Sequence, residues 1–501
     1  MAGQDRQGGR GRLTRKIGVV AAGRAANTAS LIAIYALVAR AWTAEECGLF
    51  MAVWVVGNAL IPVFLLGLPT SLLYFFPRRS EPRLLVGQVL LCLAASGLIL
   101  AGCLWLWGPQ LADVLVQEGG DSEQVAAYLL PFLPYLFAVI AAGGAETALV
   151  AADREHYLAW LQLAMGGALA TGAGGALWLG WTPEQVLALF SGLGVLRLLA
   201  ICGLVRLALG GGRWWEWEGL GELMRYTRPV GLNDAVGSLS RYVDRFVVMH
   251  FFAAGAFAEY NFGAIEVPIS LLLSAVTAVL IPEVSRFFQE GQLDEILVLW
   301  QRAVSRLALL VLPLAAFLLA FAGSLIGWLF PEYDRSAWVF RIYLLVLPLR
   351  CAAYSPLLVG MGKARWALWG SVGDLCCNIG LSLVLVAYLQ AAHPEWAFLG
   401  PAVATTLVTY LQVAFLLVAI GWHLRCGWYR LMPWGRLLRI GAGAGAAAVG
   451  CRWVSADLGG DFLQVAVGGM CFVVLIGALT WAYPQDRAEL THTWRALTRM
   501  R

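Results

Sequence analysis

Apolar runs of about twenty residues, the length that a helix needs to cross a bilayer, follow one another along this chain of 501 residues. Hydrophobic residues make up 60% of the sequence and charged residues only 13%. The connectors are too short to hold a soluble domain. The sequence therefore predicts an all-α polytopic membrane protein with about fourteen transmembrane helices. We place these spans near residues 17–39, 50–74, 84–107, 126–151, 157–180, 185–208, 230–252, 259–282, 303–329, 337–360, 366–390, 397–421, 437–454 and 462–483.

Basic residues gather at one side of the predicted spans. Most of the 35 Lys and Arg residues lie in the N-terminal tail, in the connectors that follow even-numbered spans, or in the C-terminal tail. On the other side, the connector 108–125 carries four acids and no base. Because Lys and Arg stay on the cytoplasmic side of membrane proteins, we expect both termini to be cytoplasmic. The run from Ile17 lacks a convincing cleavage site, so we interpret it as a span and not as a signal peptide.

The first twelve spans form two copies of one six-span unit. Three separate matches lie 209 to 213 residues apart: LVAADREHYLAW with LVGMGKARWALW, Pro183-Glu184 with Pro394-Glu395, and Pro69 with Pro282, each followed by two Phe. Copies with an even number of spans have the same orientation, as in transporters built from parallel repeats. The predicted parts are a basic N-tail (1–16), a first bundle (17–208), an interfacial linker (209–229), a second bundle (230–422), an extra helix pair (436–484) and a cytoplasmic C-tail (485–501).

The linker between the copies contains the segment GGGRWWEWEGLGELMRYTR, residues 210–228. Its tryptophans and charged residues predict a helix that lies on the cytoplasmic surface of the membrane. One interpretation is that these tryptophans are ordinary residues of the interfacial belt. The other is that the linker is a hinge about which the two bundles rock.

Polar residues share one face of the seventh span, residues 231–250 (GLNDAVGSLSRYVDRFVVMH). Asp234, Ser238, Arg241 and Arg245 follow one another at i, i+4, i+7 and i+11. At about 100° per residue they lie within an arc of roughly 60°. A charge at the bilayer centre costs at least about 2.5–3.5 kcal/mol, so such residues face a protein interior or a watery cavity. We therefore predict that this stripe lines a polar chamber.

The first span is the repeat counterpart of the seventh and supplies a matching face. At an offset near 210, Arg24, Thr28 and Tyr35 take the places of Asp234, Ser238 and Arg245. Arg350 lies between Pro348 and Pro356 in a span that we expect to be kinked. Arginines without intramembrane lysines favour binding of a planar, multidentate anion such as phosphate. Arg197 in the sixth span could instead extend its head group to the membrane surface.

Acidic residues also fall inside the predicted spans, and each has two interpretations. Glu146, Asp244, Glu266 and Asp374 could form structural ion pairs or stay protonated by burial. Alternatively, Asp244, Glu266 and Asp374 could couple transport to H⁺ or Na⁺. We expect no metal or other cofactor, because the ten cysteines show no ligand spacing. The chain contains no P-loop, HExxH or nucleophile elbow, so we expect a transporter and not an enzyme.

Two segments resemble Wzx-type polysaccharide flippases of the multidrug/oligosaccharidyl-lipid/polysaccharide exporter superfamily. The first is YALVARAWTAEECGLFMAVWVVGNAL, from Tyr35 to Leu60. The second is RYVDRFVVMHFFAAGAFAEYNFGAIEVP, from Arg241 to Pro268, with Asp244 and Tyr260 at typical positions. Glu259 stands where the family commonly has a glycine. The six-plus-six plan and the extra helix pair also fit the family.

The resemblance implies a flippase for undecaprenyl-pyrophosphate-linked oligosaccharide in the bacterial cytoplasmic membrane. Two six-helix bundles would enclose a central cationic cavity, in which Arg24, Arg241, Arg245 and Arg350 meet the anionic lipid-linked oligosaccharide. Membrane lipids, a polysaccharide polymerase and assembly proteins are the expected partners, and nucleic acid is not. The superfamily also contains lipid II flippases and drug exporters, which remain alternatives. A polysaccharide polymerase or ligase is disfavoured, because no outward connector is long enough to hold an acceptor chain.

Overall fold

The computed structural model describes residue 23 and residues 27–115 and 121–483, and their regular elements are helices. Nine helices in this part of the chain are long and apolar enough to cross a membrane, and other helices cover the remaining predicted spans. Helix Asn27–Ala41 represents the first predicted span, while Arg24 lies outside the described residues. The predicted fold class, an all-α polytopic membrane protein, is confirmed.

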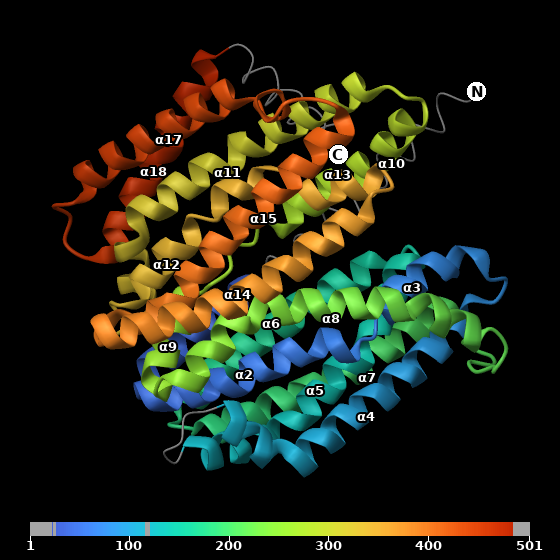
Figure 1. The fold of residues 1–501 in the computed structure, drawn as a ribbon. Coiled ribbons are helices and arrows are strands. Elements are labelled where there is room, and N and C mark those ends of the chain that lie inside the picture. Colours follow the sequence, from blue (N-terminus) through green and yellow to red (C-terminus); the bar gives the residue numbers. More distant parts are fainter. Residues whose placement is uncertain (1–22, 24–26, 116–120, 484–501) are drawn as a thin grey trace. The chain divides into compact units, whose positions relative to one another are not determined.

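The helices form two compact units that divide between Asn261 and Phe262. Helices α2 to α8 lie in the first unit, α9 crosses the boundary, and α10 to α18 lie in the second (Figure 1). The helix α8 packs on α2, α3 and α4, although the sequence repeat makes it the first span of the second copy. The compact units therefore differ from the predicted bundles, whose division at 209–229 remains a prediction. The bounds in the first unit are α2 (Ala44–Phe64), α3 (Leu68–Phe75), η1 (Phe76–Arg78), α4 (Pro82–Leu115), α5 (Asp121–Ala151), α6 (Glu155–Trp178), α7 (Pro183–Leu209), α8 (Leu220–Phe251) and α9 (Ala254–Gly263).

Aromatic side chains around Trp54 form the core of the first unit. Trp54 lies on α2, where every residue from Cys47 to Val56 is buried. Its ring centroid is 5.6 Å from that of Phe132, 5.5 Å from Tyr135 and 5.8 Å from Phe190. Such ring pairs add to the stability gained by burial alone. The core therefore ties α2 to α5 and α7.

A proline pair opens one turn of α5 in this core. Pro131 and Pro134 lie inside the helix, and the hydroxyl of Ser191 on α7 enters the opened turn. Ser191 Oγ donates to the Pro131 carbonyl and accepts from the Tyr135 N–H, at 3.2 Å. In a membrane interior, a backbone group freed by proline needs such a partner. The contact fixes the position of Tyr135.

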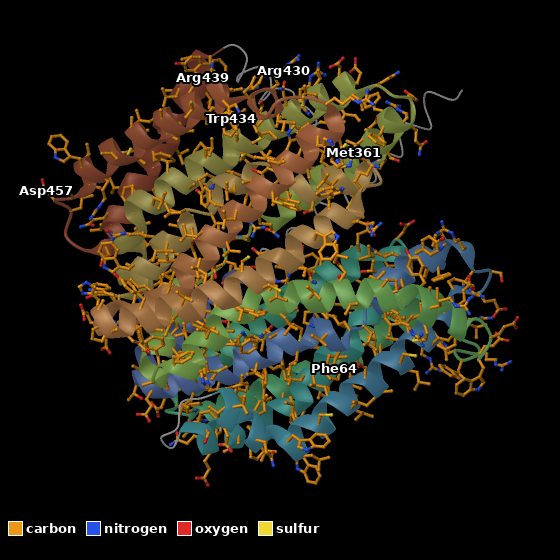
Figure 2. All side chains as sticks on the ribbon, viewed as in Figure 1. Phe64, Met361, Arg430, Trp434, Arg439 and Asp457 are labelled. Atoms are coloured by element: carbon orange, nitrogen blue, oxygen red, sulfur yellow. The ribbon has the colours of Figure 1, made fainter. Side chains whose placement is uncertain are left out.

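The predicted span 50–74 is split in two. The helix α2 ends at Phe64, which is labelled in Figure 2. The Phe64 carbonyl accepts a 2.6 Å hydrogen bond from Ser96 Oγ. Leu66 and Gly67 then take left-handed conformations, with φ of 54° and 70°. These φ values end the helix, and α3 begins at Leu68. The span predicted near 50–74 is present as one candidate span, Ala44–Arg78, and this turn interrupts its helix.

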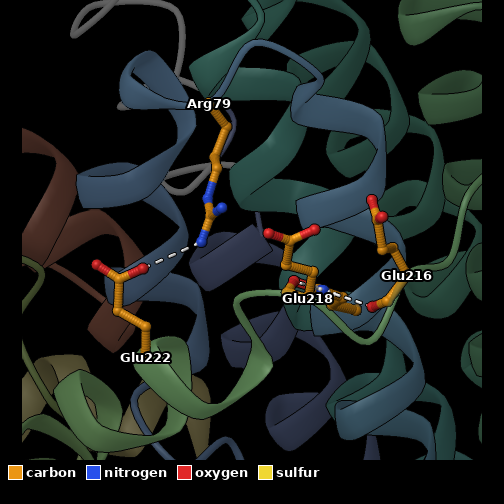
Figure 3. A network of polar contacts seen from close by, with 5 residues as sticks. Arg79, Glu216, Glu218 and Glu222 are labelled. Carbon is orange, nitrogen blue, oxygen red and sulfur yellow. Dashed lines mark hydrogen bonds and ion pairs between the residues drawn. The ribbon is translucent and has the colours of Figure 1, made fainter.

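The linker begins with a strap, residues 210–219, that is not helical. Gly210, Gly212 and Gly219 have positive φ, which favours glycine and interrupts a helix. Gln88 on α4 donates from Nε2 to the carbonyls of Glu216, at 2.6 Å, and Glu218, at 2.8 Å (Figure 3). The predicted interfacial helix is therefore wrong over 210–219, and the rest of the linker forms the first turns of α8.

The second unit contains two interrupted spans. The predicted span 259–282 is broken at residues 264–269, between α9 and α10. The predicted kink near Arg350 is confirmed, since α12 and α13 are separated by the short 3₁₀ helix η2. The helices of the second unit are α10 (Ser270–Gln289), α11 (Leu293–Leu329), α12 (Ser336–Leu344), η2 (Leu347–Cys351), α13 (Tyr354–Gly360), α14 (Ala364–Ala392), η3 (Pro394–Leu399), α15 (Gly400–Leu424), α16 (Trp428–Leu431), α17 (Trp434–Ser455) and α18 (Asp461–Ala482).

Candidate functional site

The face of α8 that carries the predicted stripe packs into the first unit. Thr227 Oγ1 donates to Ser71 Oγ at 2.9 Å. One turn later, Gly231 lies so close to Leu66 that a Cβ at position 231 would be 2.5 Å from the Leu66 carbonyl oxygen. Ser238 is fully buried, and its Oγ donates to the Ala59 carbonyl on α2 at 3.1 Å. At Ser238 the stripe is therefore closed by α2 and does not line an open chamber.

Two turns beyond Ser238, Arg245 lies among tyrosines. Its guanidinium carbon is 5.1 Å from the ring centroid of Tyr242, and the side chain is half-buried. The charge of Arg245 also acts on the hydroxyl of Tyr35, on helix Asn27–Ala41. Tyr35 and Arg245 are the counterparts that the repeat predicted, and the structure brings them together.

Four side chains from three helices form this group, which we call the tyrosine–arginine cluster: Tyr35, Tyr135, Tyr242 and Arg245. A guanidinium offers five N–H donors in a planar fork, and each tyrosine adds a hydroxyl. The arrangement can therefore hold the oxygens of a phosphate or pyrophosphate. The sequence analysis did not select Tyr135 or Tyr242. Signals were present, because Tyr135 follows a proline and Tyr242 precedes Arg245 by one helical turn.

Other predicted residues of the stripe lie nearer the start of α8. Asp234 is half-buried, Arg241 is exposed, and the charge of Arg241 acts on the Asp234 carboxylate. Thr28 is half-buried on helix Asn27–Ala41. In this part of the stripe, an acid and a base are thus neighbours on the same helix.

Asp244 has a different environment from Arg245, its neighbour in sequence. Its side chain is buried, and Tyr260 on α9 donates a 2.8 Å hydrogen bond from Oη to Oδ2. Tyr260 itself is fully buried. Successive residues of a helix point about 100° apart, which explains why Asp244 faces α9.

Glu146 on α5 and Arg197 on α7 form an ion pair inside the first unit. Their side chains are 29% and 23% exposed, so water screens the pair only in part. Each charge has a protein partner, as the structural interpretation of Glu146 proposed. Arg197 is thus a partner of Glu146 in this structure.

The remaining predicted residues lie on separate elements of the second unit. Arg350 is exposed on η2, and Asp374 is half-buried on α14. Glu266 is exposed in the segment 264–269. We expected Glu266 within a continuous span, and this is wrong because no helix forms there.

Comparison with known families identifies the type of protein that this chain resembles. A family described as "Polysaccharide biosynthesis protein" matches residues 37–333, more than half of the chain. A search of curated proteins found no sequence that matches this chain.

Several solved structures share the fold. Lipid II flippase MurJ, in an inward closed conformation, superposes with a TM-score of 0.71 at 13% identity, over 92% of this chain and 99% of that one. An inward-facing multidrug resistance MATE family transporter of the MOP superfamily superposes with a TM-score of 0.63 at 15% identity, over 80% of this chain and 96% of the transporter. A MOP superfamily transporter from Pyrococcus furiosus superposes with a TM-score of 0.60 at 13% identity, over 83% of this chain and 96% of that transporter. At such low identities the likeness establishes the fold.

Proposed function

Because the chain belongs to the polysaccharide biosynthesis protein family and has the fold of MOP superfamily transporters, we propose that it is a flippase for a lipid-linked oligosaccharide. It moves undecaprenyl-pyrophosphate-linked oligosaccharide across the bacterial cytoplasmic membrane by alternating access. A polysaccharide polymerase on the far side of the membrane is the natural consumer of the product.

The observation that supports this proposal most strongly is the tyrosine–arginine cluster. Arg245 is half-buried in a transmembrane helix, and a charge in that position is costly unless it serves a ligand or a partner. Its guanidinium already lies over the ring of Tyr242, so little side-chain freedom remains to be lost on binding. The tyrosine hydroxyls supply further donors. A pyrophosphate that links a lipid to a sugar carries two negative charges, so Arg245 would meet one of them and the tyrosine hydroxyls would donate to its oxygens.

The other arginines have supporting roles in the proposal. Arg241 contacts the anion as it enters, and Asp234 balances its charge in the empty protein. Arg24, Thr28 and Arg350 remain predicted substrate contacts. Ser238 serves packing, because its hydroxyl is bonded to α2.

Two alternatives differ in substrate. A lipid II flippase is supported by the likeness to MurJ over 92% of this chain. A cation-coupled drug exporter has less support, because intramembrane arginines such as Arg245 would repel a cationic drug. Asp244, Glu266 and Asp374 remain candidate residues for coupling to H⁺ or Na⁺.

Transport by purified protein in vesicles tests the site. Arg241→Gln combined with Arg245→Gln removes two guanidinium groups, and hydrogen bonds to charged groups contribute about 1.5–3 kcal/mol each. We expect the rate of oligosaccharide-lipid flipping to fall at least about tenfold, which corresponds to about 1.4 kcal/mol. Arg425→Gln combined with Arg430→Gln removes the same charge from the second unit and should leave the rate unchanged. Equal rates for the first variant and the wild type would reject the assigned site.

A further inference from the structure

The C-terminal helix pair, α17 and α18, borders a pocket outside the site described above. A pocket opens between α11, α17 and α18, at the end where α17 begins and α18 ends. Its apolar wall comes from Leu309 and Pro313 on α11 and from aliphatic residues of the pair. Its polar side chains are those of Arg439, Thr480 and Tyr483. The lining thus combines aliphatic surface with one positive charge and two hydroxyls.

The pocket exists because the packing of the pair changes along its length. Farther along the helices, Phe321, Phe472 and neighbouring residues fill the space between α11 and the pair. Towards the start of α17 the facing residues become small, and Gly443 and Ala444 line the open space. A Cβ at position 443 would meet its nearest neighbour, a Leu479 methyl, at an ordinary 3.8 Å. A methyl group at position 443 would therefore fit in ordinary van der Waals contact, and a longer side chain would project into the pocket.

The charged side of the pocket is organised by an aromatic ring. The guanidinium carbon of Arg439 lies 4.2 Å from the ring centroid of Tyr483, the residue that follows α18. A cation held over an aromatic ring is stabilised in that position. The charge of Arg439 is thus held where an anionic group would enter.

The surface around the pocket has the composition of a membrane interface. Residues 425–440 contain four arginines and no acid. Trp428 and Tyr429 of this segment are 68% and 63% exposed. Figure 2 shows Arg430, Trp434 and Arg439 near one end of the pair, while Asp457 lies at its other end. Exposed aromatic residues mark the head-group level of a bilayer, and basic pockets between helices bind anionic lipid head groups.

We propose that this pocket binds an anionic phospholipid, with the phosphate on Arg439 and an acyl chain along Leu309, Pro313 and Gly443. The aliphatic wall suits the chain, the guanidinium suits the phosphate, and the hydroxyl of Tyr483 suits one of its remaining oxygens. The hydroxyl of Thr480 donates to the Ile476 carbonyl, at 2.9 Å. The proposal concerns a resident membrane lipid. It is independent of which substrate the protein flips.

Lipid binding to the full-length protein in detergent tests the proposal. Native mass spectrometry and thermal unfolding are followed as dioleoyl phosphatidylglycerol or the zwitterionic dioleoyl phosphatidylcholine is added. We expect one tightly bound phosphatidylglycerol per chain and a rise in melting temperature that phosphatidylcholine does not reproduce. Equal binding of the two lipids would overturn the proposal.

Matched variants locate the site. Arg439→Gln should raise the dissociation constant for phosphatidylglycerol at least about tenfold, whereas Arg430→Gln, on the same surface but outside the pocket, should not. Gly443→Leu should block the chain position. Gly445→Leu is its control, because nothing lies within 4 Å of a Cβ there and it does not line the pocket. The proposal would be overturned if a pocket variant and its control lost equal affinity for phosphatidylglycerol. It would also be overturned if neither Arg439→Gln nor Gly443→Leu lost affinity.

Two further probes distinguish other occupants. Glycerol phosphate has the charge without the chains, and stabilisation equal to that by phosphatidylglycerol would show a simple phosphate site. Undecaprenyl phosphate has a polyprenyl chain, and tighter binding of this lipid that Gly443→Leu abolishes would show a substrate site. Either result would overturn the assignment to a phospholipid. Because these measurements need no transport, loss of flipping activity would bear on the proposed function and leave this test intact.

Discussion

Polar side chains inside the first unit are bonded to particular partners on neighbouring helices. Ser238 and Ser191 satisfy carbonyls of neighbouring helices, and Asp244 accepts from Tyr260. The sequence predicted that these positions are polar and inside the membrane. It could not predict their partners, because a partner on another helix depends on how the helices pack. Arg245 and Tyr35 were the exception, since the repeat related them directly.

The bond between Tyr260 and Asp244 should stabilise the first unit. Tyr260→Phe removes one hydrogen bond to a buried carboxylate, and we expect a loss of about 1–3 kcal/mol in unfolding free energy. Thermal unfolding in detergent measures it. Tyr410→Phe is the control, because Tyr410 donates a bond of the same length, 2.8 Å, from an exposed position. An equal loss for both variants would contradict the account. So would full additivity of Tyr260→Phe with Asp244→Asn, because partners in a hydrogen bond are coupled.

At the scale of helices, local sequence predicted most spans and only some of their interruptions. Pro348 and Pro356 indicated the break around η2, because proline disrupts a helix in a known way. The break at Leu66 and Gly67 also had a local signal, because Gly67 is followed by Pro69 in the first turn of α3. Residues 264–269 were expected to be helical because the apolar run continues across them. Pro268 within this segment is nevertheless a local signal that a helix is interrupted there.

The close contact between α4 and the strap predicts that Gly87 on α4 cannot be replaced without moving the strap. A Cβ at Gly87 would lie 1.6 Å from the Trp214 carbonyl oxygen, so Gly87→Ala must displace the strap. We expect faster trypsin cleavage at the exposed Arg213. Gly102→Ala on the same helix is the control, because nothing lies within 4 Å of its Cβ. Unchanged cleavage in Gly87→Ala would show that the strap is not held against α4.

A second pair of glycines tests the packing of α8. Gly231→Ala places a methyl group 2.5 Å from the Leu66 carbonyl oxygen, and overpacking of this kind costs about 1–3 kcal/mol. We expect a lower melting temperature for this variant. Gly221→Ala has open space and replaces glycine within the same helix, so it should be neutral or stabilising by up to about 1 kcal/mol. The reverse order of the two melting temperatures would contradict the described contact.

At the scale of the whole molecule, the sequence predicted the fold class and the family, and the comparisons confirm both. Regular apolar runs were enough for this, because a membrane restricts a spanning chain to few structures. The sequence did not predict that the compact units divide at Asn261. A sequence repeat shows which segments have similar sequences, whereas a compact unit is defined by which helices are in contact. The helix α8 is similar in sequence to the first span, so the repeat assigns it to the second copy. Its contacts place it in the first unit.

The pool of lipid-linked intermediates in cells that lack this protein tests the central claim most directly. The account predicts that undecaprenyl-pyrophosphate-linked oligosaccharide accumulates on the cytoplasmic side. The wild-type protein and the Arg425→Gln, Arg430→Gln control should restore its export, and the Arg241→Gln, Arg245→Gln variant should not. Accumulation of lipid II in its place, or an unchanged oligosaccharide pool, would contradict the claim.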